Sequence, residues 1–475
     1  MRRLAMLAAA VTGAWLLGGA PASAEAPGAV KLPAFEQLTL GNGAQIALME
    51  KHDTPLVAVT AVIRGGALGD LPGKEGSAAL LAELMQKGAG ARDAAAFAEA
   101  LESVGAELSI AAGTESLVIG ASFLSKDTEL VLGLLADALQ RPRLDAAEFD
   151  KVRMRSIQSI AAAKDSDPRA LIGEYGDAWL FGAHPYGRAV GGSEESLAVI
   201  GPDDVRGYFE QQLGGDRLIL AVVGDFSAAE MRRRVEEAFG AWRKSGTVPP
   251  PVPAPTASKG RRVLLVDKPG ATQTYFWLGN VGASRLDPAR HAQSLVNTVF
   301  GGRFTSMLNT ELRIKSGLTY GARSGFERYS APGPFQIVSY TQTATTIEAM
   351  DLALATLDRL HEDGLAPETL ASARTYMLGQ FPPTLETNGQ LASRLADLMF
   401  YGLGPEDVNQ YAERVLAVDR GATAAAIETA FPKSGDLAIV LIGDAAGIRE
   451  AVGKYGPVTE MKIADPRYAP GAATR

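Results

Sequence analysis

The chain has 475 residues, with 46 Lys and Arg, 54 Asp and Glu, four His and no Cys. Its length suits about two to four domains, because a domain commonly has about 100–200 residues. The lack of Cys excludes disulfide bonds, thiolate metal sites and cysteine nucleophiles. The net charge of −8 argues against nucleic acid as a partner, because neutralising phosphates requires a basic surface. Any histidine-rich metal site must draw on His52, His184, His291 and His361.

Residues 1–24 have the pattern of a secretory signal peptide. Two arginines precede an apolar stretch that runs to about Ala20, and Ala-Ser-Ala at 22–24 supplies a cleavage site. We predict cleavage after Ala24 and a periplasmic mature protein. No second long apolar run follows, so we predict no membrane span after cleavage. The alternative is an uncleaved membrane anchor, because the apolar stretch is nearly long enough to cross a bilayer.

Strand-like and helical patterns follow one another in blocks through the first half of the chain. Apolar residues bounded by Gly, Asp or Pro predict strands, and apolar residues three and four apart predict helices. Asp127 and Asp145 are predicted helix N-caps. The order of hairpins, then helices, then a closing strand predicts an α+β arrangement. The predicted strands are Gln45–Met49, Leu56–Ile63, Glu107–Ala111, Leu117–Phe123 and Leu218–Val223, and the predicted helices are Gly76–Gln86, Ala94–Val104, Thr128–Gln140, Ala146–Ala163 and Pro168–Leu180.

A Pro-rich segment at 246–259 divides the chain. Its prolines exclude both helix and central strand and favour an extended spacer. We therefore predict an N-terminal domain at 25–245, a C-terminal domain at 260–463 and a flexible tail at 464–475.

The two halves repeat one another. Residues 45–67 resemble residues 262–283, and LILAVVGD at Leu218–Asp225 resembles LAIVLIGD at Leu437–Asp444. The spacing between matched segments is nearly constant, which indicates an internal duplication. The predicted fold class is α+β: two homologous α/β-sandwich domains, each a mainly antiparallel sheet packed with helices, joined by the Pro-rich linker.

The segment Gly76–Ala89 (GSAALLAELMQKGA), together with the duplicated halves, resembles the insulinase/pitrilysin family of zinc peptidases. The likeness is to its short bacterial branch, similar to mitochondrial processing peptidase. Active members carry the motif H-x-x-E-H, in which two His one helical turn apart grip Zn²⁺ and the Glu activates its bound water. The matching positions here are Ala79, Ala82 and Glu83, and the third ligand position falls at Ser159. The resemblance therefore implies a degenerate zinc motif and no metal in this chain.

The remaining histidines offer no replacement site. No two of the four have the spacing of ligands on one helix. His361 is followed by Glu362 and Asp363, but adjacent residues do not share a helix face, so we interpret this segment as a solvated helix end rather than a metal site. We interpret His184, in HPYGR, as a structural turn residue.

The strongest match to the family is the segment Gly301–Gly321 (GGRFTSMLNTELRIKSGLTYG). We predict an amphipathic helix at Arg303–Arg313, ended by Ser316 and Gly317. The resemblance implies that Arg313 and Tyr320 match an Arg and a Tyr that reach into the catalytic chamber of active members. A guanidinium and a phenol both donate hydrogen bonds, which suits them to hold a peptide carbonyl. The alternative is a surface arginine and a core tyrosine beside a helix end.

The zinc-ligand positions are lost while the Arg/Tyr pair is kept. This combination suggests that the chain contributes one part of a site that is shared between two chains. In heterodimeric members of this branch, one chain brings the zinc motif and the other brings the Arg/Tyr pair. Our leading hypothesis is a catalytically incomplete, peptide-binding subunit that supplies Arg313 and Tyr320 in trans to a homologous zinc-bearing partner. The alternative is a non-enzymatic structural or peptide-binding scaffold, like the core subunits of respiratory cytochrome bc complexes. An independent hydrolase is disfavoured, because no G-x-S-x-G elbow is present and Cys is absent.

Overall fold

The structure is a computed structural model that describes residues 30–245, 247 and 251–470. The predicted signal peptide at 1–24 lies outside the described residues, as do parts of the predicted linker and tail. Within the described ranges, no helix combines the length and apolar character needed to cross a bilayer.

The N-terminal half is built on a six-stranded sheet of order β1-β2-β8-β3-β7-β6. Neighbouring strands run antiparallel except β2 and β8, which are parallel. Along β7 the residues alternate between buried and more exposed, as expected for a sheet with two different faces. The strands are β1 (Glu36–Thr39), β2 (Gln45–Glu50), β3 (Leu56–Arg64), β6 (Glu107–Ala112), β7 (Ser116–Leu124) and β8 (Leu218–Gly224), and a separate ribbon joins β4 (Gly88–Ala89) to β5 (Arg92–Asp93).

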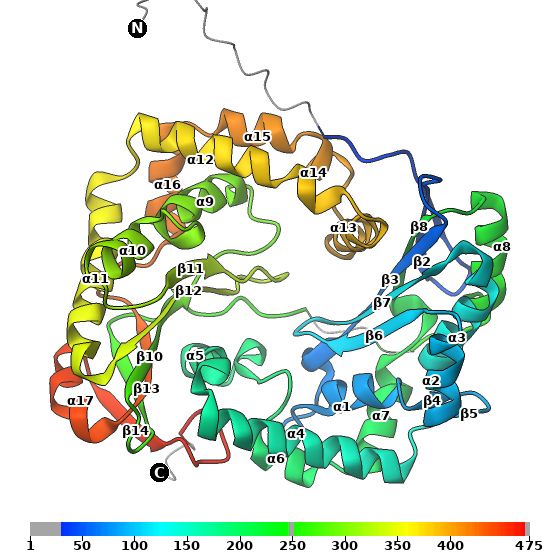
Figure 1. Cartoon of the computed structure of the whole chain (residues 1–475), viewed down its shortest axis with the longest axis horizontal. Helices are drawn as coiled ribbons and strands as arrows, with labels where there is room; N and C mark the ends of the chain where they lie inside the picture. The colour runs from blue at the N-terminus through cyan, green and yellow to red at the C-terminus, as the bar shows by residue number, and fades with distance from the viewer. Residues whose placement is uncertain (1–29, 246, 248–250, 471–475) are drawn as a thin grey trace, which may run out of the picture.

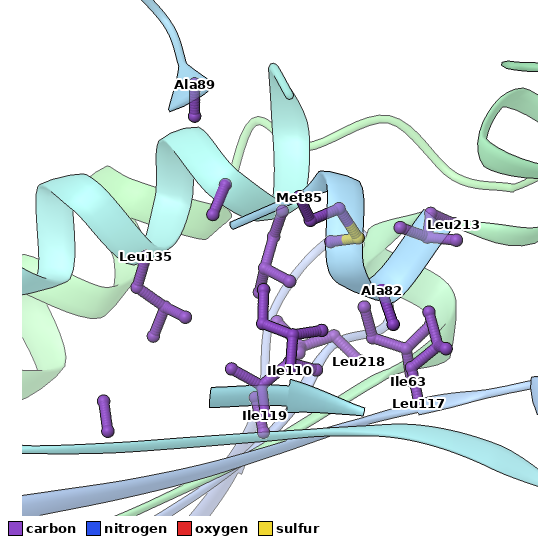
Figure 2. Close-up of a cluster of buried hydrophobic side chains, with 14 of the residues drawn as sticks. Ile63, Ala82, Met85, Ala89, Ile110, Leu117, Ile119, Leu135, Leu213 and Leu218 are labelled. Atoms are coloured by element: carbon purple, nitrogen blue, oxygen red, sulfur yellow. The ribbon is translucent and has the colours of Figure 1, made fainter. Parts of the chain in front are cut away.

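Except for α5 (Ile172–Phe181), the helices of this half cover one face of the sheet and form a single buried cluster with it. Figure 2 shows part of that cluster, where Ala82 of α1 and Met85, the residue after that helix, lie over Ile110 and Ile119 of the sheet. Burial of each large aliphatic side chain contributes about 1.5–3 kcal/mol. The helices are α1 (Ser77–Leu84), α2 (Ala94–Glu102), α3 (Thr128–Gln140), α4 (Ala146–Ser166), α5 (Ile172–Phe181), α6 (Glu194–Val199), α7 (Pro202–Gln212) and α8 (Ala228–Phe239).

The predicted strands and helices of this half are confirmed to within a few residues at their ends. The helix predicted at Pro168–Leu180 is a 3-10 turn, Pro168–Leu171, that continues into α5. The predicted capping is wrong in its chemistry. Asp127 and Asp145 precede α3 and α4, but neither side chain caps its helix. Asp145 instead accepts a hydrogen bond from Arg143 (2.9 Å), and the backbone of Asp127 lacks the extended conformation of an N-cap.

The C-terminal half repeats this plan on a second six-stranded sheet, of order β11-β12-β10-β13-β9-β14. Strands β9 and β13 pair in parallel, as β2 and β8 do, and β10, β12 and β11 repeat β3, β7 and β6. The outer strand differs, because β14 comes last in the chain and runs parallel to β9. The strands are β9 (Arg262–Asp267), β10 (Gln273–Val281), β11 (Ala322–Phe326), β12 (Pro334–Gln342), β13 (Ala438–Gly443) and β14 (Val458–Lys462).

Except for α13 (Asn388–Tyr401), the helices of the C-terminal half pack beside and above this sheet (Figure 1). The predicted fold class, two α/β units with mainly antiparallel sheets, is confirmed. The helices are α9 (Arg290–Asn297), α10 (Met307–Asn309), α11 (Thr346–Asp363), α12 (Pro367–Gln380), α13 (Asn388–Tyr401), α14 (Glu406–Asn409), α15 (Tyr411–Ala417), α16 (Arg420–Ala430) and α17 (Ala445–Val452), with π-helical turns at Thr298–Gly302 and Thr310–Lys315.

The two halves exchange a helix. Helix α5 packs on β10 and β13 of the C-terminal sheet, and α13 packs on β3 and β8 of the N-terminal sheet (Figure 1). Tyr175 of α5 is buried with Trp277, and Leu395 of α13 is buried with Met49. Each sheet is therefore closed by a helix from the other half, so the two halves share their cores.

Candidate functional site

A buried carboxylate fixes the start of α1, the helix that carries the degenerate zinc motif. The two side-chain oxygens of Asp70 accept hydrogen bonds from the backbone N–H groups of Gly76 (2.8 Å) and Ala78 (2.9 Å). Gly76 adopts φ +99°, and a Cβ there would lie 3.0 Å from the carbonyl oxygen of Gly191. Burial raises the pKa of Asp70 to about 7, although the two amides oppose that rise.

The zinc-motif positions do not converge on a space for metal. Ala79 is half-buried, and Ala82, at the position of the general base, is 1% exposed inside the apolar cluster of Figure 2. Glu83 forms an ion pair with Arg155 of α4. Ser159 is exposed one helical turn beyond Arg155.

These residues do not fit zinc. The one remaining carboxylate, that of Glu83, is already paired with the guanidinium of Arg155, whose charge repels a second cation. In the part of the chain that the structure describes, no group of three or more His, Asp or Glu is placed to hold a metal ion. The sequence reasoning missed Arg155, although a basic residue one turn before Ser159 on the same predicted helix was a visible signal.

Three of the histidines have structural partners. The Nδ1 atom of His184 accepts from the backbone N–H of Tyr186 (3.1 Å), as expected for a turn residue. His361 lies at the end of α11, with Nε2 3.1 Å from the carbonyl oxygen of Pro432. His52 contacts Asp225 on the surface, which raises the pKa of the imidazole.

The segment Gly301–Gly321, the strongest match to the family, folds differently from its prediction. The helix predicted to start at Arg303 starts at Met307, because the Ser306 side chain accepts from Asn309 N–H as an N-cap while Arg303 is extended. Three α-helical residues then pass into the π-helical turn Thr310–Lys315. The segment ends at the predicted place, where Gly317 adopts φ +69°.

Arg313 and Tyr320 are both exposed, in different surroundings. The guanidinium of Arg313 lies 4.8 Å from the ring centre of Phe304, which is itself 61% exposed. Tyr320 is 78% exposed, so the alternative of a core tyrosine is wrong. Sequence reasoning did not single out Phe304 as the residue that positions Arg313.

Tyr320 lines a hollow of about 720 Å³ on the C-terminal sheet. The hollow lies between β10, β11, β12 and the residues that lead into α5, and Arg313 is outside its lining. The rings of Tyr275 and Tyr340 lie side by side in its wall, with centres 5.7 Å apart. Arg169 and Arg323 add two cations. Asp167 also lines the hollow, 3.8 Å from Arg169, so the wall is aromatic and carries charges of both signs.

The duplication places a matching hollow of about 660 Å³ on the N-terminal sheet. It lies between β3, β6, β7 and the start of α13, the helix that corresponds to α5. Its wall is formed largely by small side chains, among them Ala58, Ser109 and Ser122. The two halves thus share a geometry but differ in chemistry, and the tyrosines and arginines belong to the C-terminal hollow.

A pair of acidic residues lies on α5, where the two halves meet. Burial and the nearby carboxylate of Glu327 raise the pKa of Glu174 to about 7. Burial and the charges of Glu327 and Glu174 raise the pKa of Asp177 well above its ordinary value. Both carboxyl groups therefore keep their protons to a higher pH than an exposed carboxyl does.

A duplicated α/β fold with a degenerate zinc helix and an intact Arg/Tyr segment defines a class: the metallopeptidase-like proteins without a complete metal site. Residues 45–192 match the family model described as Insulinase (Peptidase family M16), and residues 200–377 match the Peptidase M16 inactive domain. Together these matches cover more than half of the chain. The chain belongs to the insulinase family, peptidase family M16.

The relatives include both named peptidases and a named non-peptidase. An uncharacterized zinc protease of Mycobacterium leprae is 28% identical over 67% of this chain and 72% of its own length. The non-peptidase homolog YmxG of Helicobacter pylori is 25% identical over 76% of this chain and 83% of its own. A solved structure, the peptidase M16 inactive domain from Pseudomonas fluorescens, superposes with a TM-score of 0.81 at 22% identity, over 86% of this chain and 98% of its own. That structural likeness supports the fold.

Proposed function

We propose that this protein is the non-catalytic subunit of a heterodimeric zinc peptidase in the bacterial periplasm. It binds the peptide substrate and presents Arg313 and Tyr320 to a zinc site on a homologous partner chain. One observation carries the proposal. The Arg/Tyr segment is exposed and keeps the family pattern, while an ion pair between Glu83 and Arg155 occupies the zinc-motif positions of the same chain.

The surface around the pair supports contact with another chain. Phe304 and Ile314, which flank Arg313, are 61% and 53% exposed, and Tyr320 is 78% exposed. Large side chains gathered on a surface segment in this way favour coverage by a peptide or a protein partner. The π-helical turn widens the backbone here and presents Arg313 and Ile314 outward.

The role assigned to this chain is to bind the peptide substrate and to orient it. The guanidinium of Arg313 donates to a carbonyl oxygen and stabilises negative charge that develops there, and its contact with Phe304 limits its rotamers. The phenol of Tyr320 donates a second hydrogen bond. Zinc, when held by the partner, supplies the activated water.

The pattern of residues 1–24 supports the periplasmic assignment. Sequencing the N-terminus of the mature protein tests it. A first residue at Glu25 agrees with export and cleavage, and a mature chain that begins at Met1 contradicts it.

The test of function uses the full mature chain mixed with a homologue from the same genome that carries H-x-x-E-H. Peptide cleavage should require both chains. Arg313→Ala and Tyr320→Phe should each lower kcat/KM by about one to three orders of magnitude, the scale of losing a transition-state donor. Arg449→Ala, on the exposed α17, is the matched control and should leave the rate unchanged. Wild-type rates for both site variants would contradict the assigned role.

The second candidate is a non-enzymatic scaffold or peptide-binding protein. The name of the Helicobacter pylori relative, a non-peptidase homolog, favours it. Peptide binding by the chain alone, together with no cleavage in any mixture with a zinc-bearing homologue, would support this candidate over the first.

A further inference from the structure

A third hollow, of about 430 Å³, lies in the C-terminal half between α9, α12, α13 and α14. One side of its wall is basic and the other is aromatic and apolar. The aromatic side includes Phe381 stacked on Tyr411, with ring centres 3.8 Å apart, and Tyr376. The basic side consists of Arg285, Arg290, His291, Arg328 and Arg394.

The arginines of this wall outnumber the carboxylates that pair with them. Arg285 donates from Nη2 to Oδ2 of Asp397 (2.9 Å) and to Oδ2 of Asp407 (3.0 Å). Arg290 pairs with the other oxygen of Asp407. Arg394 is 3.9 Å from Asp397, at the limit of an ion pair. Two carboxylates therefore serve these three arginines.

Arg328 adds a fourth cation without a carboxylate bonded to it. Its Nη1 donates to the backbone oxygen of Ser284 (3.2 Å) and to Oε1 of Gln293 (2.8 Å). Asp287 is the nearby carboxylate that favours the charged form of Arg328, and Arg414 is a further cation, which pairs with Asp407. The wall thus keeps an excess of about two positive charges, which a dianion would neutralise.

Two buried polar atoms in this wall have no hydrogen-bond partner among the described residues: Nη2 of Arg328 and Nε2 of His291. Burial lowers the pKa of Arg328 to about 10 and that of His291 to about 4, so the imidazole is neutral at physiological pH. The Nη2 group of Arg328 is a donor, and a buried donor without an acceptor is costly, so an anion with several acceptor oxygens would satisfy it after a small side-chain rotation.

We propose that this hollow binds a phosphate monoester, with the phosphate group against Arg328 and Arg394 and the organic part against Tyr376 and Phe381. The planar guanidinium fork matches the geometry of phosphate oxygens. The hollow is larger than a phosphate ion, so it has room for an attached organic group. Its aromatic side is uncharged, which favours contact with that organic group rather than with a second anion. The proposal is independent of the peptidase role, because none of the residues assigned to that role lines this hollow.

Titration calorimetry of the full mature chain with phenyl phosphate, inorganic phosphate and benzoate, at one ionic strength, tests the proposal. Phenyl phosphate should bind one site per chain, about tenfold more tightly than inorganic phosphate, and benzoate should bind more weakly than phenyl phosphate. Arg394→Gln should weaken phenyl phosphate binding about tenfold. We choose this arginine because, among the residues that the structure describes, its only ion pair is the long one to Asp397. Arg449→Gln, on the remote α17, should bind as the wild type does.

A second variant tests the aromatic side of the wall separately from the basic side. Tyr376→Ala removes a side chain that is 40% exposed, so the fold should be retained. Tyr376→Ala should lower the affinity for phenyl phosphate until it approaches the affinity for inorganic phosphate. The affinity for inorganic phosphate should stay unchanged. Absence of saturable binding by both phosphate compounds, or wild-type affinity in Arg394→Gln, would overturn the proposal. Equal affinities for inorganic phosphate and phenyl phosphate would overturn the monoester assignment and indicate free phosphate, and equal affinity for benzoate would overturn the preference for phosphate.

Discussion

The carboxylate of Glu83 on α1 is paired with the guanidinium of Arg155 on α4, between the two helices that carry the lost zinc-ligand positions. The loss of zinc chemistry is therefore more than the absence of histidines. The guanidinium of Arg155 already pairs with the carboxylate at this position, and its positive charge disfavours a metal ion there.

Restoring the ligands alone should therefore give poor metal binding. In a chain with Ala79→His, Glu83→His and Ser159→Glu, zinc should bind weakly, because Arg155 loses its partner and faces the new site. Adding Arg155→Ala should raise the zinc affinity about tenfold or more, measured by competition with a chelator. Arg153→Ala is the control, because Arg153 lies on the same helix but donates to Ile200. Equal zinc affinity with and without Arg155 would contradict the role assigned to its charge.

Arg313 and Tyr320 should be replaceable at little cost in stability. Both side chains are exposed, so Arg313→Ala and Tyr320→Phe should change the free energy of unfolding by less than about 0.5 kcal/mol. Urea unfolding followed by circular dichroism measures this. A large loss of stability in either variant would mean that the segment is kept for folding rather than for contact with substrate or partner.

Much of the fold could be predicted from the sequence, because local sequence patterns specify most of its strands and helices. Strands β2 and β3 are short, largely apolar runs, and helices α3 and α4 have apolar residues three and four apart; such patterns depend on no distant residue. The π-helical turn at Thr310–Lys315 was not predictable, because an apolar spacing of three and four residues fits both helix types. The helix exchange was not predictable either, because the apolar face of α5 does not specify which sheet it covers.

The same difference between local patterns and contacts of distant residues decides which parts of the candidate sites could be predicted. Ala79, Ala82 and Glu83 were located by one continuous motif, and Arg313 and Tyr320 by another. The partner of Glu83 was missed because Arg155 lies on a distant helix and no motif links the two. The arginine-lined hollow was missed because its residues come from several helices and the loops between them, and no local pattern joins them.

The acidic pair on α5 should make stability fall as pH rises. The folded-state pKa of Glu174, about 7, and that of Asp177 lie above their ordinary values, so the folded chain holds protons that the unfolded chain has lost. Their stabilising contribution is therefore complete below the unfolded pKa values, near pH 4, and that of Glu174 is lost as pH rises through about 7. Asp177→Asn removes the charge that burial opposes, so it should raise the free energy of unfolding more at pH 8 than at pH 5.

Urea unfolding of the wild type and Asp177→Asn at pH 5, 6, 7 and 8 measures that effect. Glu362→Gln, which changes an exposed carboxylate on α11, is the control and should keep the wild-type pH profile. A stability difference between Asp177→Asn and the wild type that is the same at pH 5 and pH 8 would contradict the raised pKa.

Helix α5 should tolerate a methyl group at one glycine and not at another. A Cβ at Gly176 would lie 2.6 Å from the ring of Trp277, which is fully buried on β10. Gly176→Ala should therefore cost about 1–3 kcal/mol through overpacking between the halves. A Cβ at Gly173 would meet nothing within 4 Å, so Gly173→Ala should be neutral or stabilising by up to about 1 kcal/mol. Equal unfolding free energies for the two variants would contradict the close packing of α5 on the C-terminal sheet.

Neither half should fold alone, because each sheet needs the helix of the other. In a chain of residues 30–245, the face of the N-terminal sheet that carries Met49, Ile219 and Val223 would lose its cover from Leu395 of α13. Such exposed apolar surface promotes aggregation, whereas residues 30–245 and 251–470 produced together should recover a soluble complex with native circular dichroism. Size-exclusion chromatography of each half alone and of the pair checks this. A monomeric, cooperatively unfolding 30–245 chain would show that the helix exchange contributes little to stability.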